Sequence, residues 1–231
     1  MRRVSSLLGI MITALMLFGR AAIAEDSVIP ATEEPRHRVK LENPVVRIVD
    51  VEIPPGDQTL LHSHSLDYAF LMVNRASLLN EVQGKPPVDL SVAAGLIGYY
   101  RATQGAYIHR FTNVGTQPFR AIGIELLAAS PTPEVSAALP GSSGYVTVLD
   151  NERVRAYRLV LAPGQSTPSV TLPGRTVRVA GTNATLVETI GADSIQRRFE
   201  PAMFEWRAAP STQTLKNTGD APVTLYEFEI K

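Results

Sequence analysis

The chain has 231 residues with 22 basic and 22 acidic side chains, 45% hydrophobic residues and no cysteine. The lack of thiols excludes disulfides, Cys nucleophiles, iron–sulfur clusters and Cys-rich zinc sites. The balanced charge gives no basic surface of the kind that nucleic acids require, so no nucleic-acid partner is expected.

The first residues have the layout of a secretory signal peptide. Arg2 and Arg3 precede an apolar run over residues 7–18, and small residues follow up to Ala24. A membrane span needs about 20 apolar residues, so this run is short for one. We expect cleavage after Ala24 and a periplasmic or secreted protein without membrane association; an uncleaved anchor is the alternative. Cleavage leaves 19 basic against 22 acidic residues, a net charge near −3.

Beyond the signal peptide, nearly all regular structure is predicted to be β. Short runs rich in β-branched and aromatic residues alternate with turn residues such as Gly84, Gly95 and Gly115. Strands this short at close spacing favour a sandwich or a barrel. The predicted strands of the first half are 45–53, 67–73, 77–82, 88–92, 97–101, 107–113 and 119–127. A weak helix is predicted near 133–139.

The pattern of the first half returns in the second half. Gly56 and Gly164 are 108 residues apart, and Asn113 and Asn217 are 104 residues apart, each within similar surroundings. Such a repeat at both ends of a unit indicates an internal duplication. We therefore divide the chain into a signal peptide at 1–24, a leader arm at 25–36, a first unit at 37–128, a linker at 129–144 and a second unit at 145–231.

Three of the four histidines fall in one constellation. His62 and His64 are two residues apart, so on a strand their side chains share one face. His109 lies on the predicted strand 107–113 and can complete a facial set from a neighbouring strand. Imidazole nitrogens suit Zn, Cu, Fe and Ni. We predict that His62, His64 and His109 hold one divalent transition metal, or remain as remnants of such a site.

At these residues the chain resembles the cupins, small double-stranded β-helix (jelly-roll) barrels, and specifically the two-barrel bicupins. The spacing of the two cupin motifs is kept at Gly56, His62 and His64, and at Gly98, His109 and Asn113. The family's Glu is absent, because Tyr68 and Ala69 stand where it should fall. The resemblance implies an all-β fold of two cupin barrels in tandem.

The second unit lacks the ligands of the first. Val170 and Leu172 stand where the first unit has His62 and His64, and Gln213 replaces His109. We expect a degenerate second barrel that binds no metal, with a drier and better-filled interior.

The missing carboxylate leaves two versions of the site. Asp67 lies at an odd offset from His64, so strand parity turns it away unless a bulge reverses it. Without Asp67 the site resembles the three-histidine sites of the thiol dioxygenase and diketone-cleaving branches of the cupins. Three neutral ligands leave the metal charge uncompensated, which favours an anionic or enolate ligand. Tyr68, in place of the Glu, and Tyr107, on the face of His109, are the candidate catalytic residues.

Two classes of function follow from this resemblance. The first is a small-molecule metalloenzyme of dioxygenase type, with Fe(II) favoured and Zn, Ni, Cu or Mn as alternatives. The second is a binding or structural cupin whose metal site is vestigial or only stabilises the barrel. Arg101 and Arg110 could attract an anionic substrate or lie on a solvated face. We expect the two barrels to mimic a dimer within one chain, and a homodimer of chains is a further expectation.

Overall fold

The structure is a computed structural model, and it describes residues 27–127 and 137–231. The predicted signal peptide, its cleavage site, half of the predicted linker and most of the predicted weak helix therefore lie outside the described residues. None of the helices in the two described ranges is long and apolar enough to cross a membrane.

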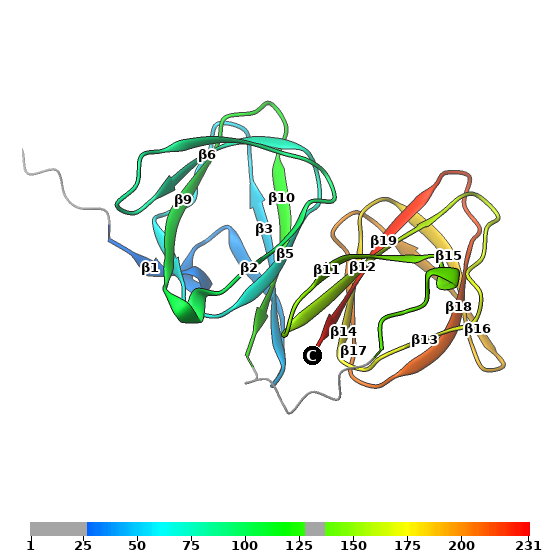
Figure 1. The fold of residues 1–231 in the computed structure, drawn as a ribbon. Coiled ribbons are helices and arrows are strands. Elements are labelled where there is room, and N and C mark those ends of the chain that lie inside the picture. Colours follow the sequence, from blue (N-terminus) through cyan, green and yellow to red (C-terminus); the bar gives the residue numbers. More distant parts are fainter. Residues whose placement is uncertain (1–26, 128–136) are drawn as a thin grey trace, which may run out of the picture.

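The first barrel is formed by two five-stranded sheets, in the orders β1-β4-β9-β6-β7 and β2-β3-β10-β5-β8. Figure 1 shows them curving around a common interior. Their strands are β1 (Ile29–Pro30), β2 (His37–Glu42), β3 (Val46–Ile53), β4 (His62–His64), β5 (Tyr68–Met72), β6 (Ala76–Val82), β7 (Val88–Val92), β8 (Ile97–Tyr100), β9 (Tyr107–Asn113) and β10 (Phe119–Leu126). Short 3₁₀ turns η1 (Ala31–Glu33) and η2 (Ala102–Gln104) complete the barrel.

The second barrel repeats this arrangement with sheets β11-β12-β19-β14-β17 and β13-β18-β15-β16. It begins after η3 (Gly141–Ser143). Its strands are β11 (Tyr145–Asp150), β12 (Val154–Leu161), β13 (Val170–Leu172), β14 (Thr176–Ala180), β15 (Ala184–Ile190), β16 (Asp193–Phe199), β17 (Phe204–Arg207), β18 (Ser211–Asn217) and β19 (Val223–Ile230). The predicted all-β fold of two tandem jelly-roll barrels is confirmed.

The duplication is visible strand by strand. β3 and β12 begin 108 residues apart, and β10 and β19 begin 104 residues apart, with equivalent neighbours in their sheets. Strand β1 has no counterpart among the described residues of the second half. It lies in the predicted leader arm and pairs in parallel with β4, where Ile29 is opposite His62. The end of this arm is therefore part of the first barrel.

The two barrels share one apolar core. On β3, Val49 and Val51 face the interior of the first barrel, whereas Val46 and Ile48 join a cluster that includes Phe228 and other residues of the second barrel. Strands β3, β5 and β10 of one barrel accordingly lie beside β11, β12 and β14 of the other (Figure 1). This contact explains why the predicted strand 67–73 has apolar side chains on both of its faces. One face lines the interior of the first barrel, and the other packs against the second barrel.

Candidate metal centre

The structure brings the three predicted histidines together inside the first barrel. His62 and His64 lie on β4, and His62 is paired directly opposite His109 on β9. All three side chains are buried. The ring centres of His62 and His109 are 4.5 Å apart, and those of His64 and His109 are 5.3 Å apart. The alternation of strand side chains thus places His62 and His64 on one face, as predicted. Metal ligation by His62, His64 and His109 remains a prediction.

His37 joins the cluster, so all four histidines of the chain converge. It comes from β2 in the opposite sheet, and its ring centre is 4.5 Å from that of His62. One ligand nitrogen from each of His37, His62 and His64 lies within 4.8 Å of the other two. His37 is not among the predicted ligands, because it lies in a charged stretch that precedes the recognised motifs. The only signal for it is that the 108-residue offset of the duplication relates it to Tyr145, which is buried in the second barrel.

Two of the rings are oriented by hydrogen bonds at Nδ1. The Nδ1 of His62 is 2.8 Å from the carbonyl oxygen of Leu60, and the Nδ1 of His109 is 3.3 Å from the Oδ1 of Asn80. Because both oxygens only accept, each Nδ1 carries the proton and each Nε2 keeps its lone pair. This is the arrangement that outer partners impose on metal-binding histidines.

His37 is held by a carboxylate that the same N-terminal segment supplies. Glu34 follows η1, is buried, and places its Oε2 2.7 Å from the Nδ1 of His37. The backbone N–H groups of Arg36 and Leu60 also donate to Glu34, at 2.7 and 3.2 Å. Burial raises the pKa of Glu34, but the hydrogen bond from His37 and the two N–H groups outweigh it and hold the pKa below its ordinary value. Glu34 therefore stays ionised beside the cluster.

The nitrogens on the inner side of the cluster fit a metal ion. The Nε2 atoms of His62 and His64 are 3.2 Å apart. The Nε2 of His109 is buried and has no hydrogen-bond partner among the described residues. Buried polar atoms are nearly always satisfied, so this nitrogen, on a ring that is 4.5 Å from that of His62, indicates an absent partner. The donor set of neutral imidazoles suits Fe, Zn, Cu or Ni.

Burial keeps these imidazoles neutral. It lowers the pKa of His62 to about 4 and that of His64 to about 3, with the charge of neighbouring histidines acting in the same direction. The pKa of His109 is lowered for the same reasons. The cluster can therefore accept a metal near neutral pH without first losing protons.

The lowered pKa values predict acid destabilisation of the metal-free protein. Below pH 6.5 the unfolded histidines bind protons that the folded ones refuse, so the free energy of unfolding falls with pH down to about 4 for His62 and about 3 for His64. Each such histidine contributes up to about 1.4 kcal/mol per pH unit. Urea unfolding from pH 7.5 to 4.5 measures this slope, and His64→Gln should reduce it. An unchanged slope in that variant would contradict the assignment.

Asp67 faces away from the histidines, as strand parity predicts. Its Oδ1 accepts hydrogen bonds from the backbone N–H and the hydroxyl of Thr103, at 2.9 and 2.6 Å, and its Oδ2 accepts one from Tyr99 at 3.0 Å. Arg153 of the second barrel lies 3.7 Å from the same carboxylate. Asp67 thus braces the β4–β5 connection against the neighbouring barrel.

We expect Asp67→Asn to leave the metal content unchanged. The amide keeps one acceptor for Thr103 but loses the charge that faces Arg153, so the loss is one of stability, on the order of 1–2 kcal/mol. Metal analysis and thermal unfolding of the same sample test both statements. Metal loss as severe as in His62→Ala would show that Asp67 is a ligand.

The two predicted catalytic tyrosines stack on the cluster. The ring of Tyr68 lies 4.6 Å from that of His64, and the ring of Tyr107 lies 4.3 Å from that of His109. Burial and nearby acidic groups raise the pKa of Tyr68, and burial raises that of Tyr107. Both phenols stay protonated and can donate hydrogen bonds. The hydroxyl of Tyr107 already accepts one from Asn80, at 3.0 Å.

A second carboxylate approaches the cluster from β10. Glu125 is paired opposite Tyr68, and its Oε1 lies 3.9 Å from the Nδ1 of His64. Its other oxygen accepts a hydrogen bond from Arg47 at 2.8 Å. Sequence analysis did not predict Glu125, because no spacing relates a residue on β10 to the first motif. Its position partly restores the acidic group that the cupin motif lost at position 68.

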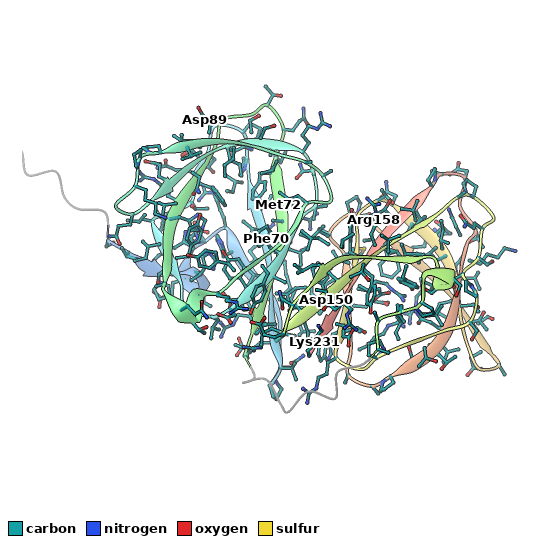
Figure 2. All side chains as sticks on the ribbon, viewed as in Figure 1. Phe70, Met72, Asp89, Asp150, Arg158 and Lys231 are labelled. Carbon is teal, nitrogen blue, oxygen red and sulfur yellow. The ribbon has the colours of Figure 1, made fainter. Side chains whose placement is uncertain are left out.

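A cavity of about 390 Å³ opens next to the histidines. His37, His64 and His109 form one end, and the walls are apolar, with Phe70 and Met72 on the β5 side (Figure 2). Its other end reaches the surface near exposed Leu96, between β7 and β8. The aromatic lining consists of Tyr68, Phe70, Tyr100, Tyr107, Phe111 and Phe119. The volume is within the roughly 300–1,000 Å³ of small-molecule sites.

The second barrel fills the equivalent space with apolar side chains and with a buried ion pair. The positions of the four histidines hold Tyr145, Val170, Leu172 and Gln213. Arg178 and Glu227, which occupy the positions of Phe70 and Gly123, form a fully buried ion pair. The interior of the second barrel therefore contains a buried ion pair that the ligand positions alone did not predict, because residues outside those positions changed as well.

Known structures share this fold. No protein-family profile and no curated protein sequence matches the chain. Among solved structures, AerE from Microcystis aeruginosa is 15% identical, with a TM-score of 0.54 over 86% of this chain and 98% of its own. Salicylate 1,2-dioxygenase from Pseudaminobacter salicylatoxidans is 12% identical, with a TM-score of 0.57 over 84% of this chain and 76% of its own. A mutant of the latter enzyme in complex with gentisate is 11% identical, with a TM-score of 0.56 over 87% of this chain and 76% of its own.

These likenesses concern the fold alone. Together with the strand order, they show that the chain has the cupin fold in two tandem barrels. The histidine cluster of the first barrel supports a metal-binding cupin.

Proposed function

We propose that this protein is an exported metalloenzyme that binds one divalent iron ion in its first barrel and oxidises a small molecule with O2. The observation that carries the proposal is the convergence of four buried imidazoles beside a largely apolar cavity. The dioxygenases among the neighbours share the fold with it. Zn, Ni, Cu or Mn are the alternative occupants.

The candidate ligands are His37, His62, His64 and His109. When bound, a divalent iron would supply Lewis acidity toward a substrate hydroxyl and electron transfer toward O2. In a dioxygenase reaction both oxygen atoms enter the product, so no external reductant is required. Glu34 and Asn80 keep the rings of His37 and His109 in the tautomers that expose Nε2.

The protein groups around the substrate have separate tasks. The protonated hydroxyl of Tyr68 can donate a hydrogen bond to an oxygen of the substrate, as can Tyr107 at the facing wall. The Glu125 carboxylate, 3.9 Å from His64, can accept a proton when a substrate hydroxyl ionises. The buried aromatic walls exclude water from the reacting atoms. The substrate would bind through an oxygen group that becomes anionic at the metal.

Metal content and oxygen consumption test this proposal together. Protein reconstituted separately with Fe(II), Zn, Ni, Cu and Mn should hold up to one ion per chain, and only the Fe(II) form should consume O2 with enol or catechol compounds. Metal binding without oxygen consumption would favour the alternative, a binding or structural cupin. Protein that stays metal-free in every case would overturn the proposal.

Export and assembly belong to the same proposal. Mass spectrometry of material from the periplasm or medium should show Glu25 at the amino terminus, and retention of Met1 would contradict export by cleavage. A homodimer of chains would appear as twice the chain mass in light scattering. The shared core between the two barrels makes such a dimer unnecessary for stability.

A further inference from the structure

We propose, on the basis of the metal site proposed above, that the cavity selects a neutral and largely apolar molecule. Its single ionisable oxygen group, a phenol, catechol or enol, would be at the metal end. A second charged group, such as a carboxylate elsewhere on the molecule, would be rejected. The inference concerns the part of the substrate that does not bind the metal. The proposed reaction alone does not determine whether that part is charged or apolar.

The first argument is the charge of the walls. Of the residues that line the cavity, all of them in the described part of the chain, none is a lysine or an arginine, and the only acid is Glu125. A carboxylate taken from water into such walls would lose its hydration without gaining a cation. The nearest arginine to Glu125, Arg47, is on the outer side and already bonds that acid.

The arginines that could have attracted an anion are engaged elsewhere. Arg110 forms a two-pronged ion pair with Glu81, at 2.8 and 2.9 Å. Arg101 pairs with Glu152 of the second barrel. Neither arginine lines the cavity. Of the two roles that the sequence left open for these arginines, attraction of an anionic substrate is therefore not supported.

The second argument is the charge around the histidines. Ionised Glu34 bonds His37, and Glu125 lies 3.9 Å from His64, so two carboxylates flank the cluster. Glu34, which bonds a candidate ligand directly, offsets part of the charge of a divalent ion from outside its ligands, whereas Glu125 is already paired with Arg47. The site therefore has less need of a strongly anionic substrate than three isolated neutral histidines would have.

The third argument is that the apolar space is kept open by one glycine. A Cβ at Gly123 would meet only Val49, at 3.8 and 3.9 Å, so a larger side chain there would extend into the cavity. The second barrel has Glu227 at the equivalent position, paired with Arg178. Gly123 and Phe70 thus give the first barrel an apolar chamber where its duplicate has a buried ion pair.

Two probes of similar shape test the inference by calorimetry on the Zn(II)-loaded protein, which cannot oxidise them. 4-tert-Butylcatechol and 3,4-dihydroxybenzoate share the chelating hydroxyls and differ in an apolar group against a carboxylate at one ring position. We expect 4-tert-butylcatechol to bind at least tenfold more tightly. Equal affinity, or preference for the acid, overturns the inference.

Gly123→Leu gives a second readout. It should weaken 4-tert-butylcatechol binding at least tenfold while the zinc content stays at the wild-type value. Gly141→Leu, on η3 in open space, is the matched control and should change neither. If the Gly123→Leu protein has an unchanged Tm and binds 4-tert-butylcatechol with wild-type affinity, the ligand does not occupy the cavity as proposed.

The outcome separates this inference from the proposed function. Failure to bind any metal overturns the proposed function, and the two probes can still be compared on metal-free protein, where the same preference is expected. Normal metal binding with preference for the acid overturns the inference alone.

Discussion

His62→Ala should abolish tight metal binding, with the metal content falling from up to one ion per chain to a background level. His62 lies at the centre of the cluster: its ring is 4.5 Å from those of both His37 and His109, and its Nε2 is 3.2 Å from that of His64. Removal of the His62 imidazole leaves the other histidines without the ligand that lies between them, so they no longer surround one metal position. Metal analysis after dialysis against a weak chelator provides the measurement.

His37→Ala decides whether the fourth histidine is a ligand. Because a nitrogen of His37 lies within 4.8 Å of those of His62 and His64, we expect at least a tenfold loss of metal affinity. Glu34→Gln should cause a smaller loss than His37→Ala, because Gln keeps an acceptor for the ring. Tyr145→Ala in the second barrel is the matched control. Wild-type affinity in His37→Ala would reduce the site to His62, His64 and His109.

Arg178→Met should destabilise the protein by about 3–5 kcal/mol, as expected for breaking a buried ion pair on one side. Arg178 is fully buried and bonds both Glu227 and Glu188, the latter at 3.0 Å. Glu188 retains Arg197 and Arg207 in the variant, but Glu227 keeps no ion-pair partner among the described residues. Urea unfolding at pH 7 measures the loss.

The double variant Arg178→Phe/Glu227→Gly serves as the comparison for that loss. It installs the side chains that the first barrel has at Phe70 and Gly123, and it removes both charges at once. We expect it to be more stable than Arg178→Met, because Glu227 is gone and Glu188 keeps Arg197 and Arg207, so no buried charge is left without a partner. A single variant that costs less than about 1 kcal/mol would show that the buried pair contributes nothing net.

The fold and the centre of the site follow largely from the sequence, because both depend on local patterns. The strand 107–113 was predicted with its observed bounds, and 45–53 within one residue of β3. The spacing of His62 and His64 placed them on one face. The predictions that failed or were incomplete depend on contacts between distant segments. Strand β2 carries mostly exposed polar side chains, so no apolar alternation marked it or its residue His37.

The buried charges of the second barrel illustrate the same limit. Arg178, Glu188 and Glu227 come from three strands, and each taken alone is typical of a solvated strand face. Only the pairing of β14 with β19 brings Arg178 opposite Glu227. Similarly, Glu125 approaches His64 only because β10 pairs with β5. Such residues are recognised once the sheet register is known.

The shared core of the two barrels has a consequence for how the protein behaves on dilution. Barrels that associate as separate chains separate when their concentration falls below the dissociation constant. Here the covalent connection makes their association intramolecular, so it does not depend on protein concentration. Val46, Ile48 and Phe228 therefore stay covered at any protein concentration. If the protein is exported as proposed and diluted into a large volume, the second barrel would act as a permanently attached partner that keeps the histidine-bearing barrel folded.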